Sequence, residues 1–224
     1  MNMTGPKLYK QKKVMVMGFL DSKLYQFLEH IANFFFLNLV WIVCCLPLVT
    51  AFPATTAMFG VLRDWHKNDN RAVVVPFLRY FRRNLKTSMV VSLLWTAGFA
   101  VVYVNMRIID PFASLFEFVL MALIGLVIIG FVFTTVYLFP VLVHFELPFR
   151  FKVRNAFFIS VSQLPYTLLG SAVMLFTAYF VYHWPVLLLF IGTLSGYLMY
   201  LICYKAFEKI GAAYEYEAQL AGKA

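Results

Sequence analysis

Long apolar runs alternate with short polar stretches along this chain. Five of the runs lie at residues 31–49, 85–105, 114–143, 161–182 and 184–204, and none carries Lys or Arg in its centre. A bilayer core of about 30 Å takes about 20 helical residues to cross. Because backbone groups in lipid must be hydrogen-bonded within the chain, each run is predicted to be a membrane-spanning helix.

A shorter apolar segment follows the first run. Residues 50–62 carry no charge until Arg63, and Pro47 and Pro53 bracket a reversal of the chain. Pro53 suits the first turn of a new helix, where its missing N–H is not needed. The segment is too short for a full straight crossing. We therefore expect a short helix inside the bundle or a re-entrant segment.

The basic residues predict how these segments cross. Lys and Arg favour the cytoplasmic side of a membrane. They gather before the first run, within 63–86, within 150–154 and after residue 204. A return at 50–62 places all of them on one side except Arg107. We predict six helical segments with both termini in the cytoplasm; five crossings with an outside N-terminus are the alternative.

The predicted fold is an all-α, polytopic transmembrane helical bundle between two cytoplasmic tails. Residues 1–30 combine five lysines with apolar positions at helical spacing, which is typical of an interfacial amphipathic helix near 14–29. Residues 31–204 form the membrane domain and 205–224 the C-terminal tail. Within the basic loop 63–86, a second amphipathic helix is expected after Pro76. Pro165 is expected to kink the span at 161–182.

Composition supports a membrane protein. Hydrophobic residues make up 62% of the chain and charged residues 13%, against about 45–50% and about 25% in soluble domains. The formal net charge is +9. In basic loops, that charge favours anionic lipid headgroups as a partner. No nucleic-acid-binding motif accompanies it, so nucleic acid is not expected as a partner.

No known catalytic, nucleotide-binding or metal-binding motif is present, so the chain is not expected to be an enzyme or to hold a cofactor or metal. Polar residues at membrane depth are costly and are therefore candidate functional sites. They could bind a ligand at the helix break or hold the helices together. These candidates are Asn33, Asn38, Thr50, Pro53, Thr55 and Thr56. Candidates for contact with a cytoplasmic partner or lipid are Arg63, Arg79, Arg82, Arg83 and Lys86.

One stretch of the chain resembles a known family. It reads Leu37-Asn-Leu-Val-Trp-Ile-Val-Cys-Cys-Leu-Pro-Leu-Val-Thr and is followed by Pro53-Ala-Thr-Thr-Ala. These residues are similar to the LN-x-x-W, LP-x-x-T and GPAT-x-A patterns of the YesL-like family of uncharacterised integral membrane proteins, found mostly in Gram-positive bacteria. Similar features recur at Phe81-Arg-Arg-Asn-Leu-Lys, Phe139-Pro-Val-Leu and Phe145-Glu. Phe52 departs from the pattern, which has Gly there.

The resemblance implies a role but no mechanism. Members of the family are associated with carbohydrate-uptake ABC transporters, which implies an accessory or regulatory role with transporter subunits as partners. The residues themselves leave a second hypothesis open, a stand-alone transporter or channel for small solutes with its site at the Pro47–Pro53 break. The sequence does not indicate an oligomeric state.

Overall fold

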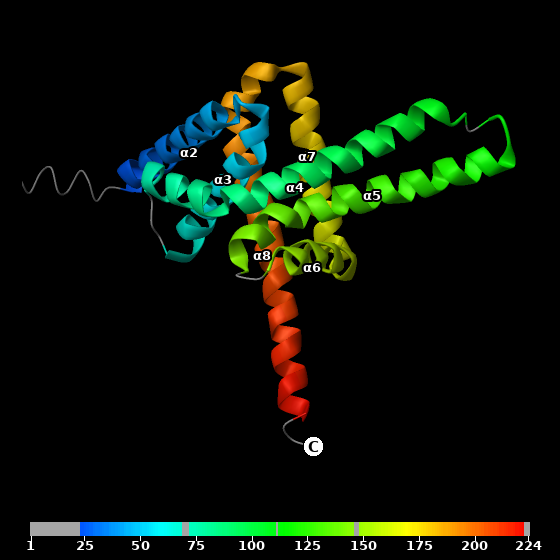
Figure 1. Cartoon of the computed structure of the whole chain (residues 1–224). Coiled ribbons are helices and arrows are strands. Elements are labelled where there is room, and N and C mark those ends of the chain that lie inside the picture. The colour runs from blue at the N-terminus through cyan, green and yellow to red at the C-terminus, as the bar shows by residue number, and fades with distance from the viewer. Residues whose placement is uncertain (1–22, 69–71, 111, 146–147, 222–224) are drawn as a thin grey trace, which may run out of the picture.

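The structure is a computed structural model that describes residues 23–68, 72–110, 112–145 and 148–221. Within them the chain forms helices joined by short turns (Figure 1). Their order is α2 (Lys23–Cys45), η1 (Leu48–Thr50), α3 (Ala51–Asn68), α4 (Val74–Ile108), α5 (Leu115–His144), α6 (Phe149–Ser162), α7 (Leu164–His183), η2 (Pro185–Leu187) and α8 (Leu188–Ala221).

The expected all-α bundle is confirmed. Five helices in the described part of the chain are long and apolar enough to cross a membrane, namely α2, α4, α5, α7 and α8. The helix α2 begins at Lys23 and continues through residue 30 without a break. The expected interfacial helix at 14–29 falls mostly outside the described residues. The expected separate helix after Pro76 is instead the first part of α4, which is continuous from Val74.

The predicted return after the first run is a helix, α3, that doubles back against α2. Trp41 of α2 donates a hydrogen bond from its indole Nε1 to Thr55 Oγ1 over 3.2 Å. The Phe34 and Trp65 rings meet with centroids 5.1 Å apart. The residue later in α2, Trp41, contacts the start of α3, and the earlier residue, Phe34, contacts the end of α3. The two helices are therefore antiparallel. The prediction of a short helix inside the bundle is correct.

The core of the protein is built around α3. Its residues Ala54, Ala57, Val61 and Leu62 are fully buried, and it packs against α2, α4, α5 and α8. Apolar side chains at spacings of three and four form the buried face of a helix. Because α3 is enclosed by other helices, it tolerates polar residues that a lipid-facing helix would not.

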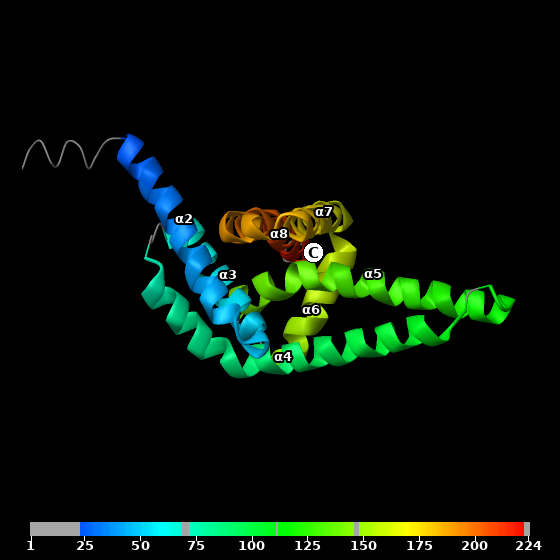
Figure 2. The ribbon, with the colours of Figure 1, turned by 90° about the horizontal axis from the view of Figure 1, so that it is seen from above.

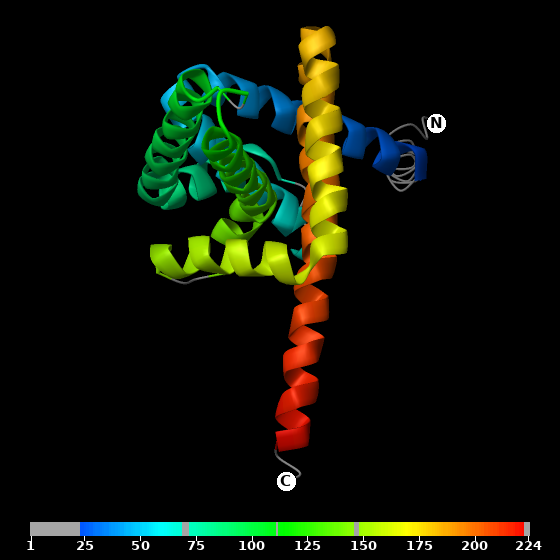
Figure 3. The ribbon, with the colours of Figure 1, turned by 90° about the vertical axis from the view of Figure 1, so that its right-hand side faces the viewer.

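The helices α4 and α5 form a long arm. Their far ends extend together beyond the other helices, and only residues 109–114 separate the two helices in the chain (Figures 1 and 2). At 35 and 30 residues they are about 52 and 45 Å long, well beyond a core of about 30 Å. The arm runs across the direction of α7 and α8 (Figure 3). Long membrane helices accommodate such excess length by tilting.

The expected kink at Pro165 is a complete change of helix. The helix α6 ends at Ser162, α7 begins at Leu164, and the two run in different directions (Figure 3). Pro165 has no N–H to continue the ladder of α6, yet it is accommodated in the first turn of α7. As a result α6 crosses the end of the bundle, and α8 continues past it as a single long helix.

We predict that Gly192→Ala destabilises the fold. A methyl group at this position of α8 would lie 2.6 Å from Asn38 Oδ1 and 2.8 Å from the Trp41 ring. Overpacking of this kind costs about 1–3 kcal/mol. The thermal unfolding midpoint in detergent should fall by several degrees. The matched control is Gly125→Ala in α5, where nothing lies within 4 Å of the new Cβ. Equal midpoints for the two variants would contradict this packing.

Candidate functional site

Thr50 and Pro53 stabilise the helix break between α2 and α3. The Thr50 hydroxyl lies 2.6 Å from the carbonyl oxygen of Cys44 and 2.7 Å from that of Pro47. Cys44 is in the last turn of α2, whose carbonyls lack partners within the helix. Pro53 is buried in the first turn of α3. These two candidates therefore satisfy or avoid unpaired backbone groups where the chain reverses.

The remaining polar candidates of this region join helices to one another. Asn38 donates from Nδ2 to the carbonyl of Leu188 over 2.7 Å, and its Oδ1 accepts from the backbone N–H of Thr193 over 2.9 Å. These bonds tie α2 to α8. Such contacts are the ones by which polar side chains hold membrane helices together.

Thr55 and Thr56 make equivalent contacts from α3. Thr55 accepts the bond from Trp41 of α2, and the Thr56 hydroxyl lies 2.9 Å from that of Ser88 in α4. Asn33 is half-buried on α2 and stands outside this network. The structure thus distributes the predicted site over three helix contacts and does not gather it around one cavity.

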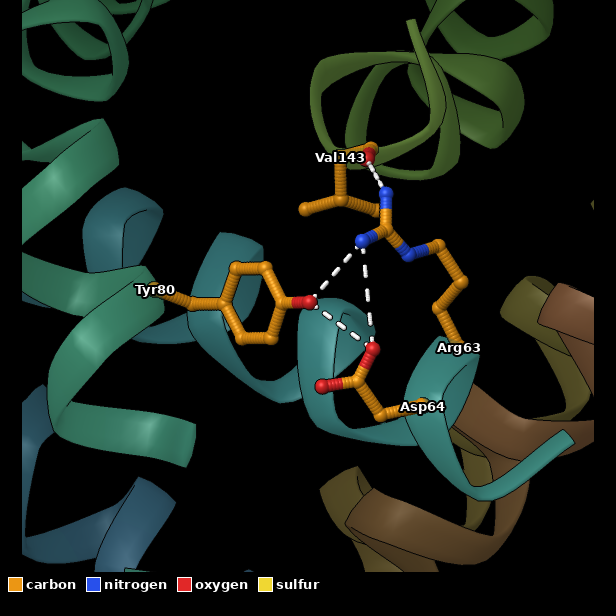
Figure 4. Close-up of polar contacts among 4 residues, drawn as sticks. All are labelled: Arg63, Asp64, Tyr80 and Val143. Carbon is orange, nitrogen blue, oxygen red and sulfur yellow. Dashed lines mark hydrogen bonds and ion pairs between the residues drawn. The ribbon is translucent and has the colours of Figure 1, made fainter. Parts of the chain in front are cut away.

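A buried polar cluster lies at the end of α3 (Figure 4). The Tyr80 hydroxyl donates to Asp64 Oδ1 over 2.8 Å and accepts from Arg63 Nη2 over 2.9 Å. Arg63 Nη2 also lies 3.8 Å from Asp64 Oδ1. Asp64 and Tyr80 are 7% and 8% exposed. Buried charges are stable only when paired and hydrogen-bonded, and here the tyrosine hydroxyl bridges the two charged groups.

The same arginine reaches the C-terminal end of α5. Arg63 Nη1 donates to the carbonyl of Val143, and Lys152 Nζ donates to that of Leu142 over 3.0 Å. The last carbonyls of a helix lack partners and carry partial negative charge. Two cations, from α3 and α6, therefore cap this helix end and fix three elements around it.

A cavity of about 750 Å³ opens beside the capped helix end. Its polar lining residues are Lys67, His144, Asn155, Ser162, Gln163, Tyr204 and Glu208. The Lys67 ammonium lies 5.7 Å from the centre of the Tyr204 ring. His144 Nδ1 is buried and finds no hydrogen-bond partner among the described residues. A pocket of this size with a few convergent polar groups has the form of a small-molecule site.

The cavity residues were not among the sequence candidates. They come from α3, α5, α6, α8 and the junction after α6. Because they are scattered along the chain, no local sequence motif predicts the cavity. Two spacings in the sequence pointed weakly to this cavity. Lys67 lies four residues after Arg63 and Glu208 four residues after Tyr204, so the two members of each pair share a helix face. A lining with one Lys and one Glu suits a polar ligand that is neutral overall better than a multiply charged ion.

The basic candidates fall into two groups. Arg63 turns inward into the polar cluster, as described above. Arg79, Arg82, Arg83 and Lys86 are exposed on α4. Their spacing of three, one and three residues places them on a single helix face.

We predict that Tyr80→Phe destabilises the fold by about 1–3 kcal/mol, because Asp64 would be left buried without the hydroxyl donor. The measurement is thermal unfolding in detergent. Tyr182→Phe is the matched control, since Tyr182 is 83% exposed. A Tyr80→Phe protein that unfolds at the wild-type temperature would show that the cluster does not hold α3 to α4.

Comparison with known proteins places the chain in a family. The family model described as "Protein of unknown function, DUF624" matches residues 34–106, a range that contains the helix break and the cluster residues Arg63, Asp64 and Tyr80. The uncharacterised protein YesL of Bacillus subtilis (strain 168) is 31% identical over 187 residues, which cover 81% of this chain and 88% of the relative.

A second uncharacterised protein of the same organism, YteU, is 32% identical over 156 residues, which cover 66% of this chain and 68% of the relative. No solved structure matches the chain. The similarity to YesL extends over more than four fifths of both proteins. The chain therefore belongs to the YesL-like family of proteins of unknown function.

Proposed function

We propose that this chain is a non-catalytic accessory protein of the membrane that docks onto another membrane complex. A carbohydrate ABC transporter is the partner that the family resemblance implies. The observation that supports docking is the arm of α4 and α5. Its large apolar side chains are 64–80% exposed at Leu93, Phe99, Ile108, Leu115, Phe116 and Leu126. Lipid or the helices of another protein must cover this surface.

Small residues on the arm favour a protein partner. A Cβ added at Gly125 of α5 would meet nothing within 4 Å, and one at Gly130 would meet only Phe157, at 4.0 Å. At the base of the arm lies an apolar groove of about 480 Å³, lined in part by Trp95, Leu126 and Gly130. Helices in membranes associate where small residues let their backbones approach closely.

The alternative function, a transporter or channel with its site at the Pro47–Pro53 break, has less support. The hydroxyls of Thr50, Thr55 and Thr56 are engaged with carbonyls or other side chains. Neither of the two cavities described above is lined by residues 47–56. A binding site at a broken helix needs polar groups that face a cavity.

We place the protein in the cell membrane with both termini in the cytoplasm. Arg107 lies near the tip of the arm, which is the end of α4 farthest from the exposed residues Arg79, Arg82 and Arg83. The polarity of these charges supports an inner location for the start of α4. The anionic headgroups of the inner leaflet are then its lipid partners.

We predict that a Gly125→Leu variant loses its membrane partner. The tagged protein is purified from native membranes in mild detergent, and the proteins recovered with it are identified and quantified. Wild type should bring down transporter subunits in stoichiometric amounts. Leu at position 125 should reduce that recovery at least tenfold by blocking close helix approach, with no change in the unfolding midpoint.

The matched control is Gly211→Leu in α8, another glycine with nothing within 4 Å of an added Cβ. It should retain the partner. Loss of the partner in this control alone would assign docking to α8. Recovery of the wild-type chain without any partner, together with solute flux by the purified protein in liposomes, would replace the accessory function with the transporter.

A further inference from the structure

A basic face on the first part of α4 stands out from the rest of the surface. Arg79, Arg82, Arg83 and Lys86 are all exposed there. The opposite face is buried against α3, through residues that include Phe77, Tyr80, Asn84 and Ser88. The helix α4 contains no Asp or Glu, so every charged side chain that this helix contributes is positive.

The basic face becomes apolar within a single turn. One turn beyond Lys86, the same side of the helix presents Val90, 48% exposed, and then Leu93, 72% exposed. Residues 87–106 contain no charged side chain, and these 20 residues span about 30 Å, the thickness of the hydrocarbon core. The next charge is Arg107. The four cations therefore lie where the hydrocarbon ends and lipid phosphates begin.

We propose that this face binds the phosphate groups of anionic phospholipids in the inner leaflet. A phospholipid offers phosphate oxygens to Arg79, Arg82 and Lys86 and an acyl chain to Val90 and Leu93. The basic part of the surface matches the headgroup of such a lipid, and the adjoining apolar part matches its acyl chain. An acidic segment of a soluble protein would match only the charged half. Arginine is suited to phosphate because its planar fork can donate two parallel hydrogen bonds.

The stripe covers eight residues from Arg79 to Lys86, or about 10 Å along the helix. Because each basic residue near an anionic membrane surface contributes about 1 kcal/mol, four of them give a selective contact. Arg63 takes no part in it, since that side chain is committed to Tyr80 and Val143.

The test measures which lipids the full-length protein retains. Purified protein is exposed to equimolar phosphatidylglycerol and phosphatidylcholine in detergent, and the bound lipids are counted by native mass spectrometry. Wild type should retain phosphatidylglycerol preferentially. The variant R79Q/R82Q/R83Q/K86Q should lose this preference, by about fivefold for each residue neutralised, the factor equivalent to about 1 kcal/mol.

The matched control removes the same amount of charge elsewhere. The variant R150Q/R154Q/K205Q/K209Q changes four exposed cations of α6 and α8 and should keep the lipid preference. A second variant, R79K/R82K/R83K, keeps the charge and should retain most of the preference even if the neutralised protein proves unstable. Inorganic phosphate at millimolar concentration should not displace the lipid, because it lacks the acyl chains.

Three results would overturn the proposal. The first is an unchanged lipid preference in the α4 variant, and the second is an equal loss in the α6 and α8 control. The third is retention of phosphatidylglycerol by the α4 variant together with loss of a co-purified membrane protein, which would make the face a protein interface. Docking through the arm is tested separately, with the Gly125→Leu variant. Failure of either proposal therefore leaves the other intact.

Discussion

Backbone carbonyls that the helices leave unpaired organise this protein, because membrane interiors supply no water to satisfy them. The break after α2 is closed by the Thr50 hydroxyl on the carbonyl of Cys44. Within α5, Pro140 cannot donate to the carbonyl of Val136. Cys203 of α8 lies with its sulfur 3.5 Å from that oxygen and takes the place of the missing donor.

The end of α5 follows the same rule with charged donors. Arg63 and Lys152 satisfy its last carbonyls, and Arg63 in turn depends on Tyr80 and Asp64. At Pro140 and at the end of α5, the unpaired carbonyls therefore draw in side chains from other helices. The contacts that solve a local backbone problem are also the contacts that set which helices are neighbours, so packing and hydrogen bonding cannot be separated here.

The sequence was a good guide to the helices and a poor one to their partners. The return of the chain at 50–62 was predictable because the basic residues on either side of the first run require it. The helix α3 continues to Asn68, into residues that were predicted to be part of the basic loop. The helix α6 was missed, because Phe149–Ser162 mixes aromatic and basic residues in the manner of an inner loop. The central place of α3 was visible only in part: the apolar segment 50–62 predicted a helix inside the bundle, but no pattern predicted that this helix would contact α5 and α8 as well as its neighbours α2 and α4.

For the candidate site too, the sequence identified residues but not the residues that they contact. The cost of polar groups in lipid drew attention to Asn38, Thr55 and Thr56, which the structure places at contacts between helices. Their partners Leu188 and Ser88 are distant in the chain and follow no spacing rule. Arg63 was grouped with the other cations by charge alone. Its contacts show that one charge in a basic region can face inward, and only the fold distinguishes it.

The buried position of α3 has a consequence for biogenesis. This helix is not among those apolar enough to cross a membrane on their own, yet it is the one that the others enclose. Its 18 residues include the charged pair Arg63 and Asp64, so α3 is poorly suited to be a single span surrounded by lipid. Its partners in α5 and α8 are synthesised later. On this reasoning the enclosure of α3 is complete only when α5 and α8 have joined α2 and α4 around it.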